Sequence, residues 1–89
     1  MYYVYLLRSN ADSKNYCGFT TNLKRRIAEH FRGEVHTTYR FDKLKLIYYE
    51  AYISKKDAEE RERYLKTTKG KRAVKLMLKD TLSPHRLAA

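Results

Sequence analysis

The segment YYVYLLRSNADSKNYCGFT, residues 2–20, predicts the first half of a small sheet. Aromatic and aliphatic side chains fill 2–7 and 16–20, and the connection between them is polar and contains several turn-forming residues. Such runs favour strands, and two of them joined in this way are typical of a β-hairpin. Because side chains alternate between the faces of a strand, Tyr5 and Tyr16 can share a face if the register allows it.

A helix is predicted after the hairpin. Residues 20–22, TTN, offer side chains that can cap free backbone N–H groups, and apolar residues then recur at helical spacing. The pattern predicts a helix over 22–32, which Gly33 ends. Arg26 and His30 are four residues apart and therefore lie one turn apart on one flank of this helix.

The second half of the chain predicts one more strand and two more helices. Ser54 opens SKKD, a helix start signal, and Gly70 separates that helix from a last, basic helix that ends before Pro84. The expected segments are a loop over 33–43, a strand over 44–53, a helix from 54 to 67 and a helix over 71–80. The order β-β-α-β-α-α predicts an α+β fold, a small three-stranded antiparallel sheet flanked by helices.

The composition indicates one small, basic domain. Eighty-nine residues accommodate a single core, and we expect a domain over 1–82 followed by a short C-terminal tail over 83–89. A net charge of +10 favours nucleic acid as the partner over an anionic membrane surface. No apolar run approaches the ~20 residues that span a bilayer, so a soluble, cytoplasmic protein is expected. Cys17, the only cysteine, excludes an internal disulfide and is expected to be a small buried side chain.

Positive charge is concentrated in two places. Residues 66–79 contain six basic side chains and no acid, and a second group stands at the start of the first helix, where backbone N–H groups also favour an anion. A solvated helix face is the usual explanation of such a run, but the imbalance of the whole chain gives at least equal weight to phosphate binding. The side chains expected to contact nucleic acid are Lys24, Arg25, Lys66, Lys69, Lys71 and Arg72.

One acid of the helix after Ser54 falls on its apolar side. If Ala58 and Leu65 are buried, Glu62 lies close to both on the inward stripe. A carboxylate there needs a partner, because its burial alone costs several kcal/mol. The spacing favours an ion pair with a basic side chain, and the alternative is a divalent-metal ligand, since Mg²⁺ commonly takes one or two carboxylates with phosphate and water.

Taken in order, these motifs resemble the GIY-YIG nuclease domain, and in particular its small stand-alone bacterial members related to the catalytic end of the excision-repair nuclease subunit. YVY stands where that family has Gly-Ile-Tyr, and YCG where it has Tyr-Ile-Gly. The likeness covers nearly all of 2–80. Its elements are YVY at 3–5, YCG at 16–18, TTNLKRRIAEH at 20–30, KLIYYEAY at 45–52 and SKKDAEERERYLK at 54–66.

The resemblance implies a metal-dependent phosphodiesterase that acts on DNA and leaves 3′-hydroxyl and 5′-phosphate ends. It implies a single Mg²⁺ or Mn²⁺ ion. A tyrosine is a weak base at neutral pH, so the chemistry needs a cation or metal-bound water close to it. Carried over by position, the site consists of Tyr16 as general base or water-positioning group, Tyr5 as its support, Arg26 on the scissile phosphate, His30 as a polar helper, Glu62 as the metal ligand, and Gly18 after the second motif.

Three positions depart from the family pattern. Tyr3 replaces the first-motif glycine, Cys17 replaces isoleucine, and no asparagine follows Asn22, whereas some family members use a late asparagine. Two hypotheses therefore stand. The chain is a DNA endonuclease directed to a structure or lesion in repair or recombination, or it is a weakly active or inactive nucleic-acid-binding module of the same fold. RNA is not excluded as the partner, and a monomer and a homodimer are both compatible with the sequence.

Overall fold

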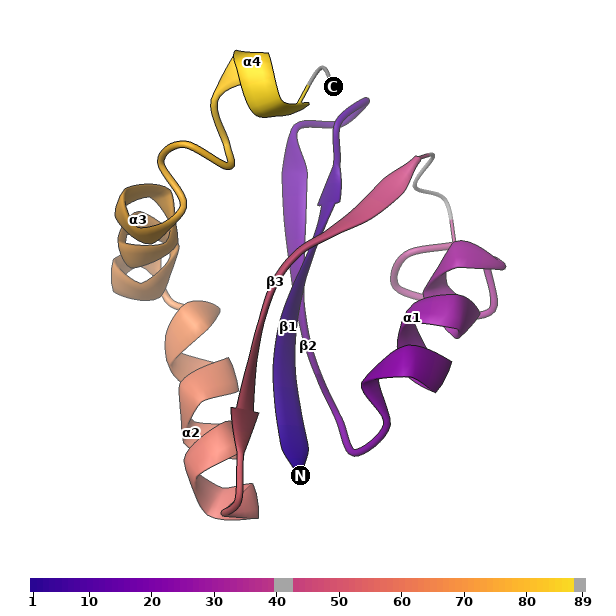
Figure 1. Ribbon diagram of the computed structural model, residues 1–89, viewed down its shortest axis with the longest axis vertical. Coiled ribbons are helices and arrows are strands. Elements are labelled where there is room, and N and C mark those ends of the chain that lie inside the picture. Colours follow the sequence, from indigo (N-terminus) through magenta and orange to yellow (C-terminus); the bar gives the residue numbers. More distant parts are fainter. Residues whose placement is uncertain (40–42, 88–89) are drawn as a thin grey trace.

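The computed structural model describes residues 1–39 and 43–87. Part of the loop predicted over 33–43, namely residues 40–42, and the end of the tail predicted over 83–89 lie outside the described residues. The elements are β1 (Tyr2–Ser9), β2 (Lys14–Thr20), α1 (Leu23–Phe31), β3 (Leu44–Tyr52), α2 (Lys55–Leu65), α3 (Thr68–Met77) and α4 (Pro84–Leu87). Their order and the three-stranded antiparallel sheet confirm the predicted α+β class (Figure 1).

The sheet has the strand order β2-β1-β3, so the hairpin strand β1 is central and both β2 and β3 are edges. In the antiparallel register of the hairpin, Tyr5 is opposite Gly18 and Leu7 is opposite Tyr16. Tyr5 and Tyr16 are therefore diagonal neighbours on one face of the sheet. The register left open by the sequence is the one that brings the two tyrosines together.

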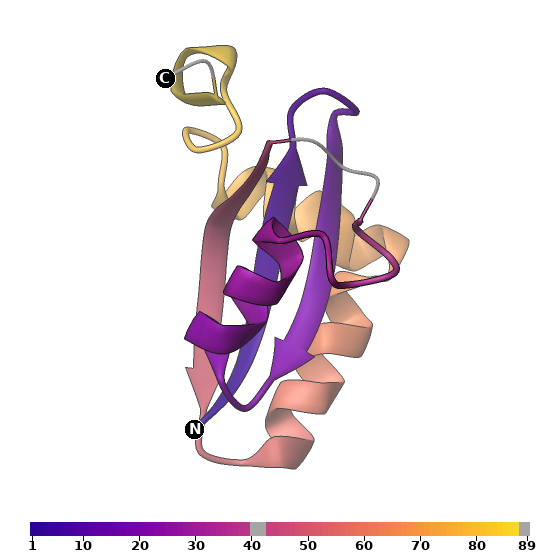
Figure 2. The same cartoon turned by 90° about the vertical axis from the view of Figure 1, so that its right-hand side faces the viewer.

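The sheet separates two helical layers. Figure 2 shows α1 on one face, with α2 and α3 behind the other. On the α1 side, Tyr5 and Leu7 pack with Ile27. On the opposite side, Val4 and Leu6 pack against α2 and α3, in a cluster that also contains Cys17, Ala58, Leu65, Val74 and Leu78. Each layer thus has its own core, and alternate residues of β1 belong to one or the other. Cys17 is buried, as predicted.

The boundary between α2 and α3 differs from the prediction. The sequence places the break at Gly70, but α2 ends at Leu65, and Thr67 is the N-cap of α3. The Gly70 N–H donates to the Thr67 hydroxyl at 3.0 Å, which is a normal capping bond of the first helical turn. Gly70 is required for packing, because a Cβ there would overlap the backbone of Tyr64 and Leu65.

The end of α1 and the start of α4 are each set by one residue. Gly33 ends α1 with φ of +74°, in the left-handed region that glycine adopts without strain, as the sequence predicts. The four-residue α4 was not predicted. It begins with Pro84 after Ser83, and proline at the first helical position is a recognisable start signal. None of the described helices is long and apolar enough to cross a bilayer.

Candidate active site

Tyr5 and His30 form a buried hydrogen-bonded pair between β1 and α1. Their side chains are almost fully buried, with 1% and 2% exposure. The Tyr5 hydroxyl is 2.7 Å from Nε2 of His30, and Nδ1 of His30 is 2.6 Å from the Thr38 hydroxyl in the segment after α1. Three polar groups from three segments are thus linked inside the α1 layer, where an unpaired polar group would be costly.

The His30 imidazole, in the middle of these hydrogen bonds, is neutral at all but acidic pH. Burial lowers the pKa of His30 to about 4, and the neighbouring Arg26 guanidinium acts in the same direction. A neutral imidazole carries one N–H and one acceptor nitrogen, so either Tyr5 donates to His30, which donates to Thr38, or both bonds are reversed. In both cases His30 holds the Tyr5 hydroxyl in one position.

Tyr5 is a phenol that keeps its proton. Burial raises its pKa to about 12, although the Arg26 guanidinium beside it acts in the opposite direction. The Tyr16 ring lies next to both partners, with centroid distances of 6.3 Å to Tyr5 and 5.2 Å to His30. Unlike Tyr5, Tyr16 is only partly buried and is open to a groove. Of the two tyrosines, only Tyr16 is accessible to a substrate without rearrangement.

Gly18 explains how the Tyr5 ring fits against β2. A Cβ at Gly18 would overlap the Tyr5 hydroxyl and the ring carbon that carries it. Tyr5 is buried and held by His30, so it has little room to move away. The glycine of the YCG motif is therefore a packing requirement of the tyrosine pair, and this reason is not visible in the sequence.

Arg26 and Arg25 have different surroundings. Nη1 of Arg26 donates to Glu29 Oε1 at 3.1 Å, and the guanidinium lies beside the Tyr5 hydroxyl. The Arg25 side chain is 67% exposed, and its Nε is 3.9 Å from Glu29 Oε2. Of the two arginines, only Arg26 faces the tyrosine pair.

Glu62 forms the ion pair that its spacing favours. Lys66 Nζ is 3.1 Å from Glu62 Oε2, one turn along α2, and the Glu62 side chain is 22% exposed. Partial burial is the largest single effect and disfavours the charged Lys66 ammonium. The hydrogen bond and the charge of Glu62, together with Cys17 and Tyr16, act in the opposite direction, and their sum raises the pKa of Lys66. The Glu62–Lys66 pair therefore lies in electrostatic reach of the YCG motif, although it belongs to the opposite helical layer.

Of this pair, only the Glu62 carboxylate suits a divalent cation in chemical terms, because the Lys66 ammonium cannot ligate a metal. Within residues 1–39 and 43–87, no group of three or more His, Cys, Asp or Glu side chains is arranged to hold a metal. Glu62 has a second carboxylate oxygen with no hydrogen bond to another described residue. One carboxylate is sufficient for Mg²⁺ when water and substrate phosphate complete the coordination, so Glu62 is the residue that could hold such an ion.

Helix α2 is fixed to β3 by a partly buried charge cluster that the sequence did not reveal. Arg61 donates to both carboxylate oxygens of Glu50, with Nε–Oε1 of 2.9 Å and Nη2–Oε2 of 3.0 Å. The hydroxyls of Tyr48 and Tyr52 also donate to Glu50. Tyr48 and Tyr52 are each two residues from Glu50 on β3, so all three side chains share a face, which was the available signal. The cluster sets the position of the helix that carries Glu62.

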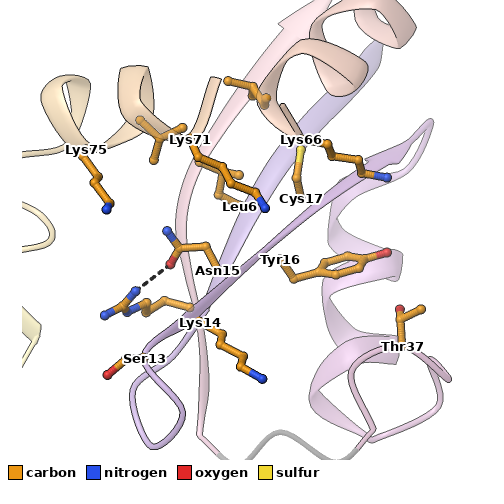
Figure 3. A pocket seen from close by; sticks show the side chains of 13 residues that line it. Leu6, Ser13, Lys14, Asn15, Tyr16, Cys17, Thr37, Lys66, Lys71 and Lys75 are labelled. Atoms are coloured by element: carbon orange, nitrogen blue, oxygen red, sulfur yellow. Dashed lines mark hydrogen bonds between the residues drawn. The ribbon is translucent and has the colours of Figure 1, made fainter. Parts of the chain in front are cut away.

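A groove of about 620 Å³ begins at Tyr16 and Lys66 and continues between β2 and α3 (Figure 3). Of the side chains predicted to contact nucleic acid, Lys66 and Lys71 line it. Lys69 and Arg72 do not line it and are exposed on α3, whereas Lys24 lines a second hollow beside Tyr3 and Tyr49. The lining also contains basic residues that were not singled out as contacts, namely Arg8, Lys14 and Lys75.

The chain is similar in sequence and fold to several known proteins. The family model described as the GIY-YIG catalytic domain matches residues 1–76. A UPF0213 protein of Limosilactobacillus reuteri is 41% identical over 80 residues, covering 86% of this chain and 82% of the relative. A UPF0213 protein of Natronomonas pharaonis is 37% identical over 81 residues, covering 90% and 94%. The solution NMR structure of a UPF0213 protein from Bacillus halodurans aligns with a TM-score of 0.55 and 28% identity, over 97% of this chain and 92% of that one.

Proposed function

Because the chain belongs to the GIY-YIG catalytic domain family, a family of nuclease type, we propose that it is a metal-dependent DNA endonuclease that recognises a branched or damaged structure. One observation carries the proposal: Tyr5, Tyr16, His30 and Arg26 meet at one place, although they come from β1, β2 and α1. A buried tyrosine–histidine pair beside a guanidinium and an accessible phenol is more than packing of the core requires.

We assign the roles as follows. Tyr16, the accessible phenol, positions or deprotonates the attacking water at the scissile phosphate. Tyr5 remains protonated and acts as a fixed hydrogen-bond donor or support, and His30 holds it there. The Arg26 guanidinium stabilises the charge that develops on the phosphate oxygens. A divalent ion held by Glu62, Mg²⁺ or Mn²⁺, would supply Lewis-acid polarisation of the phosphate.

The test is cleavage of a panel of plain, branched and damaged DNA substrates with and without Mg²⁺ or Mn²⁺. We expect metal-dependent nicking by the wild-type protein and a loss of at least about a hundredfold in Tyr16→Phe, Arg26→Ala and Glu62→Gln, since each removes a group that acts in the transition state. Matched controls are Arg63→Ala and Glu60→Gln, two changes on α2 outside the proposed site, which should retain activity. The proposal fails if wild-type protein and the three site variants cleave equally.

A second candidate function is binding without catalysis. Two observations favour it: Glu62 is already paired with Lys66, and no asparagine follows Asn22. This module would bind nucleic acid with strong salt dependence, and Glu62→Gln and metal would leave the affinity unchanged. Metal-dependent turnover that Glu62→Gln abolishes would exclude this function. An RNA panel run in parallel distinguishes the sugar preference, since phosphate contacts alone do not.

A further inference from the structure

The groove extends well beyond the tyrosine cluster along an open edge of the sheet. β2 is an edge strand, and α3 lies across from it on the α2 side. Figure 3 shows Tyr16 and Thr37 at one end, while Lys71 and Lys75 extend from α3 toward β2, where Asn15 lies. A single ligand could therefore extend from Tyr16 along the groove to Lys71 and Lys75.

The positive charge of the groove is largely uncompensated. Most of the ion pairs in the described residues lie outside the groove, such as Arg61 with Glu50 and Arg32 with Glu34. Among the described residues, the three lysines Lys14, Lys71 and Lys75 have no ion pair, and the groove lining contains no acid. Unpaired cations that face one groove repel one another, and a polyanion would relieve this repulsion.

Arg8 adds an incomplete hydrogen-bond set to the same groove. Its Nη1 donates to Asn15 Oδ1 at 3.0 Å, whereas its Nε is buried without a partner among the described residues. Buried donors are nearly always satisfied in folded proteins, so a missing partner calls for an explanation. An anionic ligand that draws the guanidinium into the groove would supply one.

Much of the surface that the groove exposes is apolar, whereas a nucleic acid bound only through its phosphate backbone would need no apolar surface. The exposed surface is more apolar than polar, and it includes the partly buried Tyr16 ring at one end. Leu6, Leu65, Val74 and Cys17 lie beneath this surface and are themselves almost fully buried. In duplex DNA the base faces are stacked on one another and cannot reach such a surface. Unpaired bases can, and sites for single strands combine a cationic groove with apolar or aromatic platforms for their faces. The volume lies in the range of about 300–1,000 Å³ that is common for small-ligand pockets, which is too small for a duplex.

We propose that this groove holds unpaired nucleotides of a single-stranded arm that leaves a DNA duplex next to the cleaved phosphate. The inference rests on the proposed nuclease function for the position of that phosphate at Tyr16. Lys71 and Lys75 contact the backbone of the arm, and the exposed apolar surface of the groove receives its bases. The preferred substrate is therefore a duplex with an unpaired arm at the cleavage site.

The test compares two labelled DNAs, a blunt duplex and the same duplex with one single-stranded arm. Binding is measured by fluorescence anisotropy in EDTA, so that metal-dependent cleavage does not interfere. We expect the arm to increase wild-type affinity by about tenfold or more, the equivalent of one stacked base. The double variant Lys71→Ala/Lys75→Ala should lose this gain, keep its affinity for the blunt duplex, and show a salt dependence for the armed DNA that is shallower by about 1.4, or about 0.7 per lost contact.

The matched control is Lys55→Ala/Lys56→Ala, which removes the same charge from exposed positions at the other end of α2. It should keep the arm preference. The proposal is overturned if the wild-type protein binds both DNAs equally, if the groove variant weakens both equally, or if the control has the same effect. A retained arm preference without any cleavage would overturn only the nuclease proposal. Cleavage that requires Arg26 without an arm preference would overturn only the groove proposal.

Discussion

At the scale of single residues, the site depends on contacts between residues that are far apart in the sequence. Tyr5 faces Gly18 across the hairpin, His30 across the layer and Arg26 one helical turn before His30. Thr38, which completes the hydrogen-bond chain, was not predicted, because it stands in a segment without periodicity. Thr38 lies eight residues after His30, a spacing that has no meaning in the sequence, and only the fold brings its hydroxyl to the imidazole.

Replacement of Gly18 by alanine tests the fit of Tyr5 directly. The new Cβ must displace the Tyr5 ring, and this movement breaks or lengthens the bond to His30. A displacement of about 1 Å in a catalytic group can cost about a hundredfold in rate, so we expect a loss of that order in kcat, larger than the loss of stability explains. The measurement is cleavage rate per folded molecule, with urea denaturation of the same sample.

The control for this change is Gly33→Ala. A Cβ at Gly33 meets no atom within 4 Å, but φ of +74° is strained for alanine. We expect Gly33→Ala to lower the free energy of unfolding by about 1–2 kcal/mol and to leave the cleavage rate of folded molecules unchanged. Equal effects of the two variants on that rate would contradict the idea that Gly18 supports activity by leaving room for the Tyr5 ring.

At the scale of elements, every strand and the first three helices were predicted from the sequence, because the strands are aromatic and aliphatic runs and the helices have recognisable start signals or apolar spacing. Tyr2 to Leu7 form an unbroken aromatic and aliphatic run, and α1 carries apolar residues at helical spacing between an Asn22 cap and Gly33. The α2–α3 break was misplaced because the tight packing of Gly70 against Tyr64 has no sequence signature. The partner of Glu62 was predicted as a class, but Lys66 could be identified only from the coordinates.

The Glu50–Arg61 cluster gives a prediction about how α2 is held. Arg61→Ala leaves the partly buried Glu50 carboxylate with two tyrosine hydroxyls but no opposite charge. We expect the free energy of unfolding to fall by about 1–3 kcal/mol, because a desolvated charge loses its main partner. Urea denaturation checks the value, and Arg63→Ala, an exposed change on the same helix, should stay within about 0.5 kcal/mol of wild type. Equal losses in both variants would contradict the anchoring role.

Across the whole molecule, the proposed site is assembled from both helical layers. The tyrosine–histidine chain belongs to the α1 layer, whereas Glu62 and Lys66 come from the α2 layer, and they approach one another only around the edge strand β2. A hairpin with α1 alone would lack Glu62, the proposed metal ligand, and one wall of the groove. This arrangement explains why the order of the motifs suggested roles for these residues but could not predict the groove, which needs the position of α3 relative to β2.

The burial of His30 between the sheet and α1 makes the stability of the fold depend on pH. Its pKa is about 4 in the folded protein and about 6.5 when unfolded, so below about pH 6.5 the unfolded state binds a proton that the folded state excludes. Stability must therefore fall as pH decreases from 6.5 toward 4. Between pH 7.5 and pH 5.5 this group should cost about 1 kcal/mol of unfolding free energy, measured by urea denaturation at each pH.

His30→Gln separates this effect from the other titrating groups, because an amide can hydrogen-bond to Tyr5 and Thr38 without taking up a proton. The variant should be less stable than wild type at pH 7.5, and the difference should shrink by about 1 kcal/mol at pH 5.5, since only wild type carries the histidine penalty. A constant difference would mean that His30 titrates alike in both states. That result would also remove the basis for treating the imidazole as a neutral support of Tyr5, because a histidine that ionises normally could share the positive charge at the phosphate.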